Sequence, residues 1–548
     1  MLRGMIMDRP LLISSILDYA VDYFGAREVV SVTADDPAHR TCYRELGARA
    51  KRLANALSQR FGVKPGDRVA TLAWNDHRHL EIYYGVSGIG AVCHTINPRL
   101  FADQIVYIVN HAADRLLFAD PMFWPLIREL APKLPSLEHI VLMTTPSAMP
   151  AGSEATCLDY ETVLSQQSSS FIWPELDDKT ASGLCYTSGT TGVPKGVLAH
   201  HRSTVLHSLS IALPNALGIG ADDVVLPVVP MFHVNAWGLP YACPMTGAKM
   251  VMPGPKLDGA SLSALFEREE VTLSAGVPTI WAGLLDPQAG KKLSALKSVV
   301  IGGSAAPLAM IKRFEEEHDV LALHGWGMTE MGPVGTICRL GPAFDQLDRP
   351  AKLDCKVKQG RPLFGVDVKI VDDAGEACPH DGETAGLLMV RGPWITSGYF
   401  GDDAANAEAF DGDGWFKTGD VATMDADGFV LITDRVKDMI KSGGEWISSI
   451  ALENLAVGHP AVAEAAAIGV RHETWGERPL LIIVKQGGRQ VTASELITYL
   501  QSRIAKWQLP DDVLFVDELP HTATGKIQKA ELRDRFQNHL WPSERDDG

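Results

Sequence analysis

The sequence has no run of basic residues, no long apolar segment and no internal repeat, and each absence excludes a class of protein. Its formal charge is −17, from 50 basic and 67 acidic side chains. An acidic surface repels phosphate backbones, which argues against nucleic acid and anionic membranes as main partners. No apolar run approaches the length that crosses a bilayer, so we expect a soluble protein without membrane insertion. A nucleotide would need local cationic or backbone groups to bind.

Close cysteine pairs are also missing. The eight cysteines are scattered along 548 residues, which indicates neither a metal site nor a disulfide framework. Reduced thiols in the core of a cytoplasmic protein are the expected state. The N-terminal segment has Asp8 and Pro10 ahead of a short apolar stretch, which is a poor secretory signal.

The order of apolar segments predicts an α/β fold. Short apolar strands at 69–74, 91–96, 115–120 and 139–144 are separated by helix-length segments, and the alternation resumes after residue 180. Such alternation is typical of parallel strands covered by helices on both faces. The length exceeds what one hydrophobic core organises. Residues 145–180, rich in Ser, Pro and Ala, are interpreted as a connection between subdomains, and residues 360–433 as a strand-rich region.

The last hundred or so residues have the pattern of a separate small α+β domain. Segments 463–470 and 480–485 read as strands. Thr492 and Glu495 form a capping-box signature for a helix that carries Leu496, Leu500 and Ile504.

Residues 186–196 (YTSGTTGVPKG) combine glycines, hydroxyl side chains and Lys195 directly after a strand. Backbone N–H groups and hydroxyls in such a loop can hold phosphate oxygens, and the lysine adds a mobile charge. The segment is not a Walker A loop, because Pro194 and Gly196 stand where Gly and Ser/Thr are required. Alone, it does not decide between a phosphate site and an ordinary loop.

This loop resembles the phosphate-loop signature of the adenylate-forming superfamily, which includes acyl-CoA synthetases, adenylation domains and firefly luciferases. Six further motifs of that superfamily follow in its order, and together the seven span nearly the whole chain. They are MFHVNAW at 231–237, GGSAAP at 302–307, HGWGMTE at 324–330, WFKTGD at 415–420, DRVKDMIKSGGEWIS at 434–448 and TATGKIQK at 522–529.

The resemblance implies an enzyme that uses ATP and Mg²⁺ to activate a carboxylic acid as its acyl-adenylate and then transfers the acyl group to coenzyme A. It also implies a large N-terminal domain (1–433) of stacked α/β subdomains with a β-rich subdomain. A hinge (434–438) centred on Lys437 would join it to a small mobile C-terminal domain (439–548). Lys437 could equally be an ordinary surface lysine.

By resemblance, Lys526, Glu330, Thr329 and His233 are the catalytic residues. Glu330 would bind Mg²⁺, and Thr329 would contact the α-phosphate; a hydroxyl beside a carboxylate suits this hard cation. Lys526 would bridge the acid and the α-phosphate and so lower their repulsion. Without that context, a glutamate after threonine or a lysine in a turn is usually a solvated side chain.

The same resemblance implies nucleotide and CoA contacts over several motifs. In this arrangement Asp420 accepts both ribose hydroxyls, a strong charge-assisted contact, with Arg435 beside it. The full set is Thr187, Ser188, Gly189, Thr190, Thr191, Gly192, Lys195, Gly303, Ser304, Ala305, His324, Gly325, Trp326, Gly327, Met328, Asp420, Ile432, Arg435, Lys441, Gly443, Gly444, Glu445 and Trp446.

The acyl site is expected at His233, Trp237, Gly302 and Trp326. His233 would be an aromatic wall beside the acyl carbonyl, and Trp237 resembles the gate of a fatty-acyl tunnel. The alternative for both is core packing. Many relatives have tyrosine where this chain has Trp326, and the larger indole is expected to narrow the acyl pocket.

Three other functions share parts of this pattern. An amino-acid adenylation domain is disfavoured because Phe232 and His233 occupy the stretch where an aspartate would hold the α-amino group. A luciferase-like oxygenase stays open. A non-catalytic AMP-binding protein should have lost Lys526, Glu330 or Asp420, and all three are present.

Within the acyl-CoA synthetases, the segments PMFHVNAW, SGGEWIS and AKWQLP resemble the medium/long-chain fatty acyl group. Within it, the chain looks like ligases that act on 3-methylmercaptopropionate. The expected substrate is that acid or another short to medium-chain acid, and a long-chain fatty acid is the alternative. Relatives in this group imply a homodimer through the first thirty or so residues.

Overall fold

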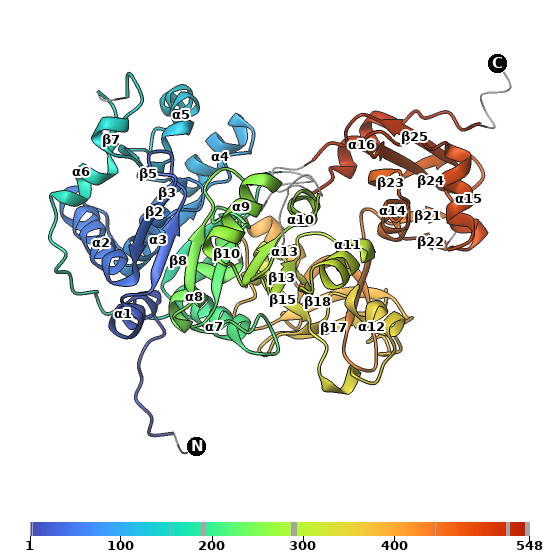
Figure 1. Cartoon of the computed structure of the whole chain (residues 1–548), viewed down its shortest axis with the longest axis horizontal. Helices are drawn as coiled ribbons and strands as arrows, with labels where there is room; N and C mark the ends of the chain where they lie inside the picture. Colours follow the sequence, from blue (N-terminus) through green and yellow to red (C-terminus); the bar gives the residue numbers. More distant parts are fainter. Residues whose placement is uncertain are drawn as a thin grey trace.

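The computed structural model describes residues 2, 4–153, 155–187, 193–286, 293–443, 445–521 and 526–542. Figure 1 shows a large body built from most of the chain and a smaller body that holds β21–β25 and α14–α16. The described residues contain no helix that is both long and apolar enough to cross a bilayer. All eight cysteines are free thiols, six of them buried.

One sheet of the large body has the order β7-β6-β5-β3-β4-β8-β9, parallel except for the edge strand β9. The last pair is a hairpin whose connection is the Gly/Thr-rich loop, so both ends of that loop are tied to the sheet. The strands are β3 (Arg68–Leu72), β4 (Val92–Thr95), β5 (Leu116–Ala119), β6 (His139–Leu142), β7 (Leu158–Asp159), β8 (Ala181–Tyr186) and β9 (Gly196–His200). Its helices are α2 (Tyr43–Asn55), α3 (His77–Gly88), α4 (Ala102–Ala112), α5 (Trp124–Leu130) and α6 (Tyr160–Ser165).

The second large sheet has the order β16-β15-β14-β13-β12-β10-β11-β1-β2, with a parallel centre and antiparallel edges. The strands are β1 (Glu28–Ser31), β2 (His39–Cys42), β10 (Val224–Pro227), β11 (Lys249–Met252), β12 (Leu273–Gly276), β13 (Ser298–Ile301), β14 (Leu321–Gly327), β15 (Val334–Cys338) and β16 (Arg361–Pro362). The helices of this part are α1 (Ile13–Phe24), α7 (His201–Ala212), α8 (Leu239–Thr246), α9 (Gly259–Glu269), α10 (Pro278–Leu284), α11 (Leu308–Lys312) and α12 (Arg349–Lys356). The predicted parallel α/β architecture is confirmed.

The largest hydrophobic core joins helices from both parts. Leu17 of α1, Leu46 of α2, Tyr84 of α3, Ile211 of α7 and Tyr241 of α8 are buried in it together. These contacts make one continuous body of the two large sheets, because burial of these side chains removes apolar surface from water on both sides.

The strand-rich region is a four-stranded antiparallel sheet with α13 beside it. Its elements are β17 (Asp367–Val371), β18 (Gly386–Arg391), α13 (Asp403–Ala409), β19 (Phe416–Met424) and β20 (Val430–Arg435). The smaller body consists of β21 (Ile440–Ser442), β22 (Glu445–Ile447), α14 (Ser449–Val457), β23 (Val462–His472), β24 (Gly476–Lys485), α15 (Ala493–Gln501), β25 (Asp512–Val516) and α16 (Lys529–Phe536). Both regions agree with the predicted fold.

The predicted capping box of α15 is present. Thr492 Oγ1 accepts from the Glu495 backbone N–H, and the Glu495 carboxylate accepts from the Thr492 N–H at 2.8 Å. The helix ends at Gln501, so Ile504 lies beyond it. The capping pattern is local and was therefore readable, whereas the helix end is decided by packing of Leu496 and Leu500 into the core.

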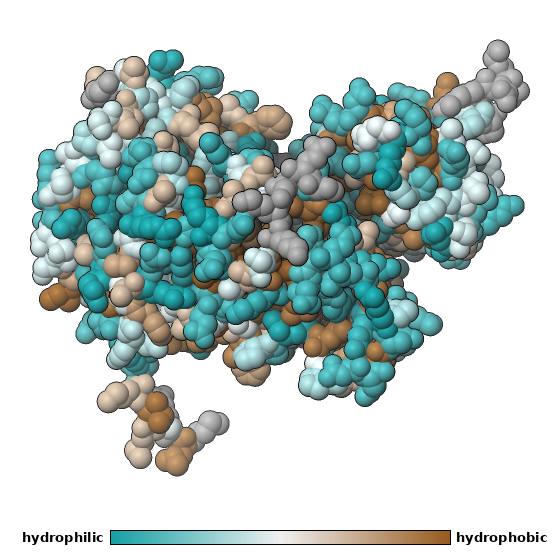
Figure 2. Space-filling view, in the orientation of Figure 1, coloured by the Kyte–Doolittle hydropathy of each residue, from teal (hydrophilic) through white to brown (hydrophobic). Residues whose placement is uncertain are grey.

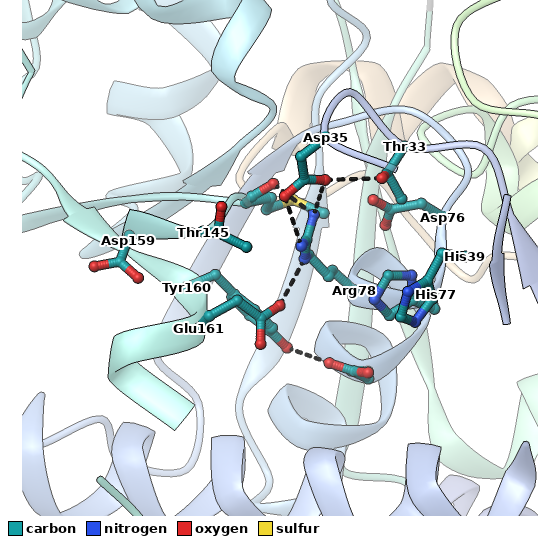
Figure 3. A network of polar contacts seen from close by, with 12 residues as sticks. Thr33, Asp35, His39, Asp76, His77, Arg78, Thr145, Asp159, Tyr160 and Glu161 are labelled. Atoms are coloured by element: carbon teal, nitrogen blue, oxygen red, sulfur yellow. Dashed lines mark hydrogen bonds and ion pairs between the residues drawn. The ribbon is translucent and has the colours of Figure 1, made fainter. Parts of the chain in front are cut away.

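Residues 145–180 are more structured than the sequence indicated, because they contain β7 and α6. Asp159 caps α6 by accepting from the Thr162 N–H at 2.8 Å. Figure 3 shows Glu161 of α6 turned toward Arg78 of α3, which also binds Asp35 with both terminal nitrogens. Ion pairs of Glu161 bind this helix to Arg78 of α3 and to Arg49 of α2. These contacts join distant segments, so neither the periodicity nor the composition of residues 145–180 predicts the helix.

Candidate active site

A cavity of about 620 Å³ gathers residues from all seven motifs. Its wall combines the two ends of the Gly/Thr-rich loop, the ends of β13, β14 and β19, and Lys526 of the smaller body. The predicted residues that line it are Thr187, Lys195, His233, Trp237, Gly302, Gly303, Gly325, Trp326, Gly327, Met328, Thr329, Glu330, Arg435, Lys437 and Lys526.

Hydrogen bonds between Thr187 and Lys195 join the two ends of the Gly/Thr-rich loop. The Thr187 N–H donates to the Lys195 carbonyl at 2.9 Å, and the Lys195 N–H donates to Thr187 Oγ1 at 3.2 Å. Lys195 Nζ lies 4.9 Å from the centre of the Tyr399 ring. The predicted phosphate contacts Ser188, Gly189, Thr190, Thr191 and Gly192 lie outside the described residues.

Thr329 and Glu330 form a short 3₁₀ turn after β14, and both side chains are nearly buried at the cavity wall. The Tyr399 hydroxyl donates to Glu330 Oε1 at 2.8 Å, and the Thr396 N–H donates to the Glu330 carbonyl at 2.7 Å. A carboxylate and a hydroxyl at one wall are oxygen donors that suit Mg²⁺, which takes few protein ligands and keeps water and phosphate oxygens.

Asp420 is held from two sides. The indole N–H of Trp326 donates to Oδ2 at 2.9 Å, and Arg435 Nε lies 3.2 Å from Oδ1. β19 and β20 place Asp420 and Arg435 directly opposite each other. Asp420 is buried and is not among the residues that line the cavity, although its neighbours Gly419 and Arg435 are. Each carboxylate oxygen retains a second lone pair for a further donor.

Lys526 lies in a group of charges within the cavity. Burial and the nearby Arg435 lower its pKa to about 8, while Asp420 and Glu330 act in the opposite direction. Burial, assisted by Lys526, lowers the pKa of His233 to about 4. At neutral pH the site therefore holds a neutral imidazole beside a mostly protonated lysine.

Trp237 forms an apolar wall opposite Gly302. A Cβ atom at Gly302 would lie 3.0 Å from the indole and 3.1 Å from the Gly325 carbonyl oxygen, so a side chain there would push the indole or the backbone aside. Trp237 is the last of four consecutive non-glycine residues with left-handed backbone, Val234–Trp237, with φ between 44° and 57°, and Gly238 continues the run. Left-handed backbone is costly for residues other than glycine, and no sequence signal predicted it. Val300, Val334 and Ile337 complete the apolar part of the cavity.

His207 supports this wall from behind. Its Nε2 accepts from the Val334 N–H at 3.1 Å, and a Cβ at Gly238 would lie only 2.7 Å from its Nδ1. Burial lowers the pKa of His207 to about 3, so the ring is neutral and can accept. Sequence reasoning missed His207, because nothing in its helix distinguishes it from a core residue.

Several predicted contacts do not line the cavity. His324 packs behind the wall: its Nε2 accepts from the Ala306 N–H at 3.2 Å and its Nδ1 donates to the Val357 carbonyl at 2.9 Å. In the β21–β22 hairpin, Lys441 Nζ lies 5.4 Å from the exposed Trp446 ring. The predicted residues absent from the lining are Ser304, Ala305, His324, Asp420, Ile432, Lys441, Gly443, Glu445 and Trp446, whereas Gly444 is outside the described residues.

Tyr399, Asp402 and Lys417 also line the cavity and were not predicted. Tyr399 contacts both Glu330 and Lys195, yet it lies in a loop without periodic pattern. Only its position directly before a Phe-Gly-Asp turn could have drawn attention to it.

Two family models match the chain. The model described as AMP-binding enzyme matches residues 18–400, and the AMP-binding enzyme C-terminal domain matches residues 451–526. A 3-methylmercaptopropionyl-CoA ligase of Ruegeria lacuscaerulensis is 52% identical over 98% of this chain and 99% of its own length. A medium-chain-fatty-acid–CoA ligase of Ectopseudomonas oleovorans is 50% identical over 98% of each chain.

A long-chain-fatty-acid–CoA ligase of Thermus thermophilus is 46% identical over 97% of each chain. Among solved structures, an anthranilate CoA ligase in complex with anthranoyl-AMP superposes with a TM-score of 0.85 at 27% identity, over 96% of this chain and 98% of that one. The chain therefore belongs to the AMP-binding enzyme family, as an acyl-CoA ligase.

Proposed function

We propose that this ligase acts on a short to medium-chain carboxylic acid, such as 3-methylmercaptopropionate, in two steps that share one cavity. In the first, an oxygen of the acid attacks the α-phosphorus of ATP, and pyrophosphate leaves. In the second, the thiol of CoA attacks the acyl carbon, and AMP leaves. The observation that carries the first step is Lys526, a cation from the smaller body beside Glu330, Asp420 and His233.

Lys526 serves adenylation because two anions must approach each other. A cation between the carboxylate and the α-phosphate lowers their repulsion and stabilises the charge that develops at phosphorus. Its lowered pKa still leaves it mostly protonated at neutral pH, and bound ATP adds negative charge that favours the protonated form. His233, neutral and half-buried, would pack against the acyl carbonyl without adding a competing charge.

Glu330 and Thr329 would hold Mg²⁺ together with the phosphates. Both line the cavity, and their carboxylate and hydroxyl are oxygen donors of the type this cation prefers. The bound cation would neutralise part of the phosphate charge. Asp420 would accept the ribose hydroxyls, with Trp326 and Arg435 holding its oxygens in place.

The second step requires a change in the position of the smaller body, which we propose rotates about Lys437 within the hinge 434–438. Lys437 lines the cavity together with Lys526, whereas the predicted CoA contacts Lys441, Gly443, Glu445 and Trp446 do not. The present arrangement suits adenylation. A rotation at Lys437 would divide the chain into an N-terminal domain, 1–433, and a C-terminal domain, 439–548. Hinges need only a few residues that absorb backbone rotation.

The short-acid assignment is supported by the apolar wall. The cavity of about 620 Å³ must hold the adenylate and the acyl group together, and Trp237 closes its apolar part opposite Gly302. Trp326 contributes less to this limit than its size suggested, because its N–H is bound to Asp420 on the nucleotide side. Relatives named for methylmercaptopropionate and for medium-chain acids are consistent with this size.

A long-chain fatty acid is the second candidate, and the Thermus relative favours it. It requires Trp237 to act as a gate that swings away and opens a longer tunnel. The strained left-handed turn beneath Trp237 would then be one of two backbone states.

A substrate panel tests both candidates. CoA-dependent AMP release is measured with acids from acetate to palmitate and with methylthiopropionate, for wild type and Trp237→Ala. Each methylene of the acid that is buried improves its binding free energy by about 0.8 kcal/mol. An acyl chain long enough to clash with the Trp237 indole loses roughly 1–3 kcal/mol of binding free energy. We expect a maximum at short to medium acids, moved to longer ones by Trp237→Ala. A wild-type specificity constant for palmitate at or above that for butyrate would refute the short-acid assignment; absence of AMP release with every acid would refute the function.

We also propose a cytoplasmic homodimer that pairs through the N-terminal segment. Figure 2 shows this segment projecting from the body, and its apolar residues Leu2, Met5, Ile6 and Met7 are more than 90% exposed. Contiguous exposed apolar side chains of this kind mark association surfaces. Light scattering of the full chain should give twice the monomer mass. A variant with Met5, Ile6 and Met7 changed to serine should dissociate into monomers at a higher protein concentration than the wild type.

A further inference from the structure

Residues 396–402 connect the turn of Glu330 to the Gly/Thr-rich loop. At one end, the Thr396 N–H donates to the Glu330 carbonyl at 2.7 Å. At the other, the Phe400 N–H donates to the Gly196 carbonyl at 2.8 Å, immediately after Lys195. The segment therefore sets the distance between the two parts of the wall that would face the nucleotide phosphates.

Tyr399 lies between these two backbone contacts, and its side chain contacts the same two parts of the wall. Its hydroxyl donates to Glu330 Oε1 at 2.8 Å, and its ring lies 4.9 Å from Lys195 Nζ. The side chain is 9% exposed, lines the cavity and packs against the Phe416 ring at 6.4 Å. One side chain thus contacts the anionic and the cationic group of the phosphate end.

The chemistry of each contact is directional. A carboxylate oxygen can only accept a hydrogen bond, so the Tyr399 hydroxyl is the donor in its contact with Glu330. Donation to Oε1 selects one orientation of the carboxylate and leaves Oε2 as the oxygen that Tyr399 does not occupy. The ring face attracts the Lys195 ammonium by a cation–π interaction and limits the positions its flexible stem can take.

We propose that Tyr399 is a positioning residue for acyl-adenylate formation, with its hydroxyl orienting Glu330 toward a divalent cation and its ring directing Lys195 toward the same phosphates. This inference rests on the proposed function, because it assumes that the phosphates of ATP and their cation lie at this wall. Tyr399 itself neither binds the cation nor transfers a proton.

Two substitutions separate the two contacts. Tyr399→Phe removes the hydroxyl and keeps the ring, so Glu330 loses its donor while Lys195 keeps its platform. Tyr399→Leu removes both. The matched control is Tyr84→Phe, which removes one buried tyrosine hydroxyl whose hydrogen bond, 2.9 Å to the Pro240 carbonyl, lies away from the cavity.

The first measurement is the affinity of the protein for Mn²⁺, which serves as a probe for Mg²⁺. Binding is detected by electron paramagnetic resonance in the presence of a non-hydrolysable α,β-methylene analogue of ATP. Loss of a hydrogen-bond partner that orients a metal-binding carboxylate typically weakens metal binding by about 10–100-fold, so we expect about tenfold weaker Mn²⁺ binding for Tyr399→Phe. The Mg²⁺ concentration for half-maximal adenylation should rise by a similar factor, while kcat at saturating Mg²⁺ and the KM for the acid stay within about threefold of wild type. Tyr399→Leu should in addition raise the KM for ATP.

Tyr84→Phe should lower the melting temperature and leave Mn²⁺ binding unchanged. Unchanged Mn²⁺ affinity in a folded Tyr399→Phe variant would overturn the positioning role, and so would an equal loss in Tyr84→Phe, which would assign the effect to stability alone. If wild-type protein formed no acyl-adenylate with any acid, the proposed function would fail. The Mn²⁺–nucleotide titration would still decide on the Tyr399 contact.

Discussion

The indole N–H of Trp326 donates a hydrogen bond to Asp420 Oδ2 over 2.9 Å, although the two residues lie 94 positions apart. This contact joins the HGWGMTE and WFKTGD motifs across the boundary between the nine-stranded sheet and the strand-rich region. Under the proposed function, this contact would place the indole on the nucleotide side of the cavity and leave Trp237, opposite Gly302, on the acyl side.

Asp420→Asn should weaken ATP binding without unfolding the protein. The amide keeps the shape of the side chain but loses the charge that assists hydrogen bonds from the ribose, which costs about 1–3 kcal/mol. The KM for ATP, measured with saturating acid, should rise accordingly. An unchanged KM would mean that the carboxylate does not contact the ribose.

Trp326→Phe tests how the two residues cooperate. Phenylalanine keeps an aromatic wall but removes the donor to Oδ2, so we expect a smaller rise in the KM for ATP than for Asp420→Asn. Because both changes act on one hydrogen bond, the double variant should cost less than the sum of the single ones. Strict additivity, seen in a double-mutant cycle of ATP affinity, would contradict this coupling.

Lys526→Ala should nearly abolish acyl-adenylate formation, because loss of one positioned charge typically costs two to three orders of magnitude, as a rough estimate. Thioester formation from supplied acyl-adenylate should be largely unaffected, since that step would use the rotated smaller body. Single-turnover assays of the two half-reactions check this. Equal damage to both would show that the lysine is not specific to adenylation.

The pH dependence of adenylation follows from the same lysine. Its pKa of about 8 means that the cation is present below pH 8 and is lost as the pH rises through that value. The kcat/KM for ATP, which reports on the free enzyme, should therefore fall above about pH 8. Lys526→Arg, slower in absolute rate, should lack this fall, because guanidinium stays protonated. The same fall in both proteins would place the titrating group elsewhere.

Gly238→Ala should destabilise the fold and disturb the Trp237 wall. Gly238 has φ of +83°, where alanine costs about 1–2 kcal/mol, and the new Cβ would meet His207 Nδ1 at 2.7 Å, an overpacking worth roughly 1–3 kcal/mol. Gly66→Ala is the matched control, since Gly66 has φ of +85° and no neighbour within 4 Å of a Cβ. Denaturant titrations should show the larger loss for Gly238→Ala; equal losses would mean that His207 moves aside freely.

Lys437→Pro should spare one half-reaction but not both. Proline restricts φ to about −65° and so holds the backbone of the hinge in whichever arrangement tolerates it. Pre-steady-state assays of adenylation and thioester formation distinguish the two outcomes. If both steps remain intact, the rotation is centred at another residue.

Much of the fold and many of the residues that line the cavity could be predicted, because their signals are local. The Thr492–Glu495 capping box depends on residues three apart, and the strand before the Gly/Thr-rich loop reads directly from its apolar run. Helix α6 was missed because its ion pairs with Arg49 and Arg78 join distant segments. Tyr399 and His207 were missed for the same reason, since each acts through a partner far away in the chain.

The sequence by itself determined the class of chemistry, because seven motifs in a fixed order carry the lysines, carboxylates and glycines that adenylate formation requires. Only the tertiary structure decided where each side chain lies. It turned Trp326 toward Asp420, packed His324 behind the wall, and set Trp237 on a left-handed turn opposite Gly302. The physical reason is that residue type sets which interactions a side chain can make, whereas packing between distant elements selects the one that it does make.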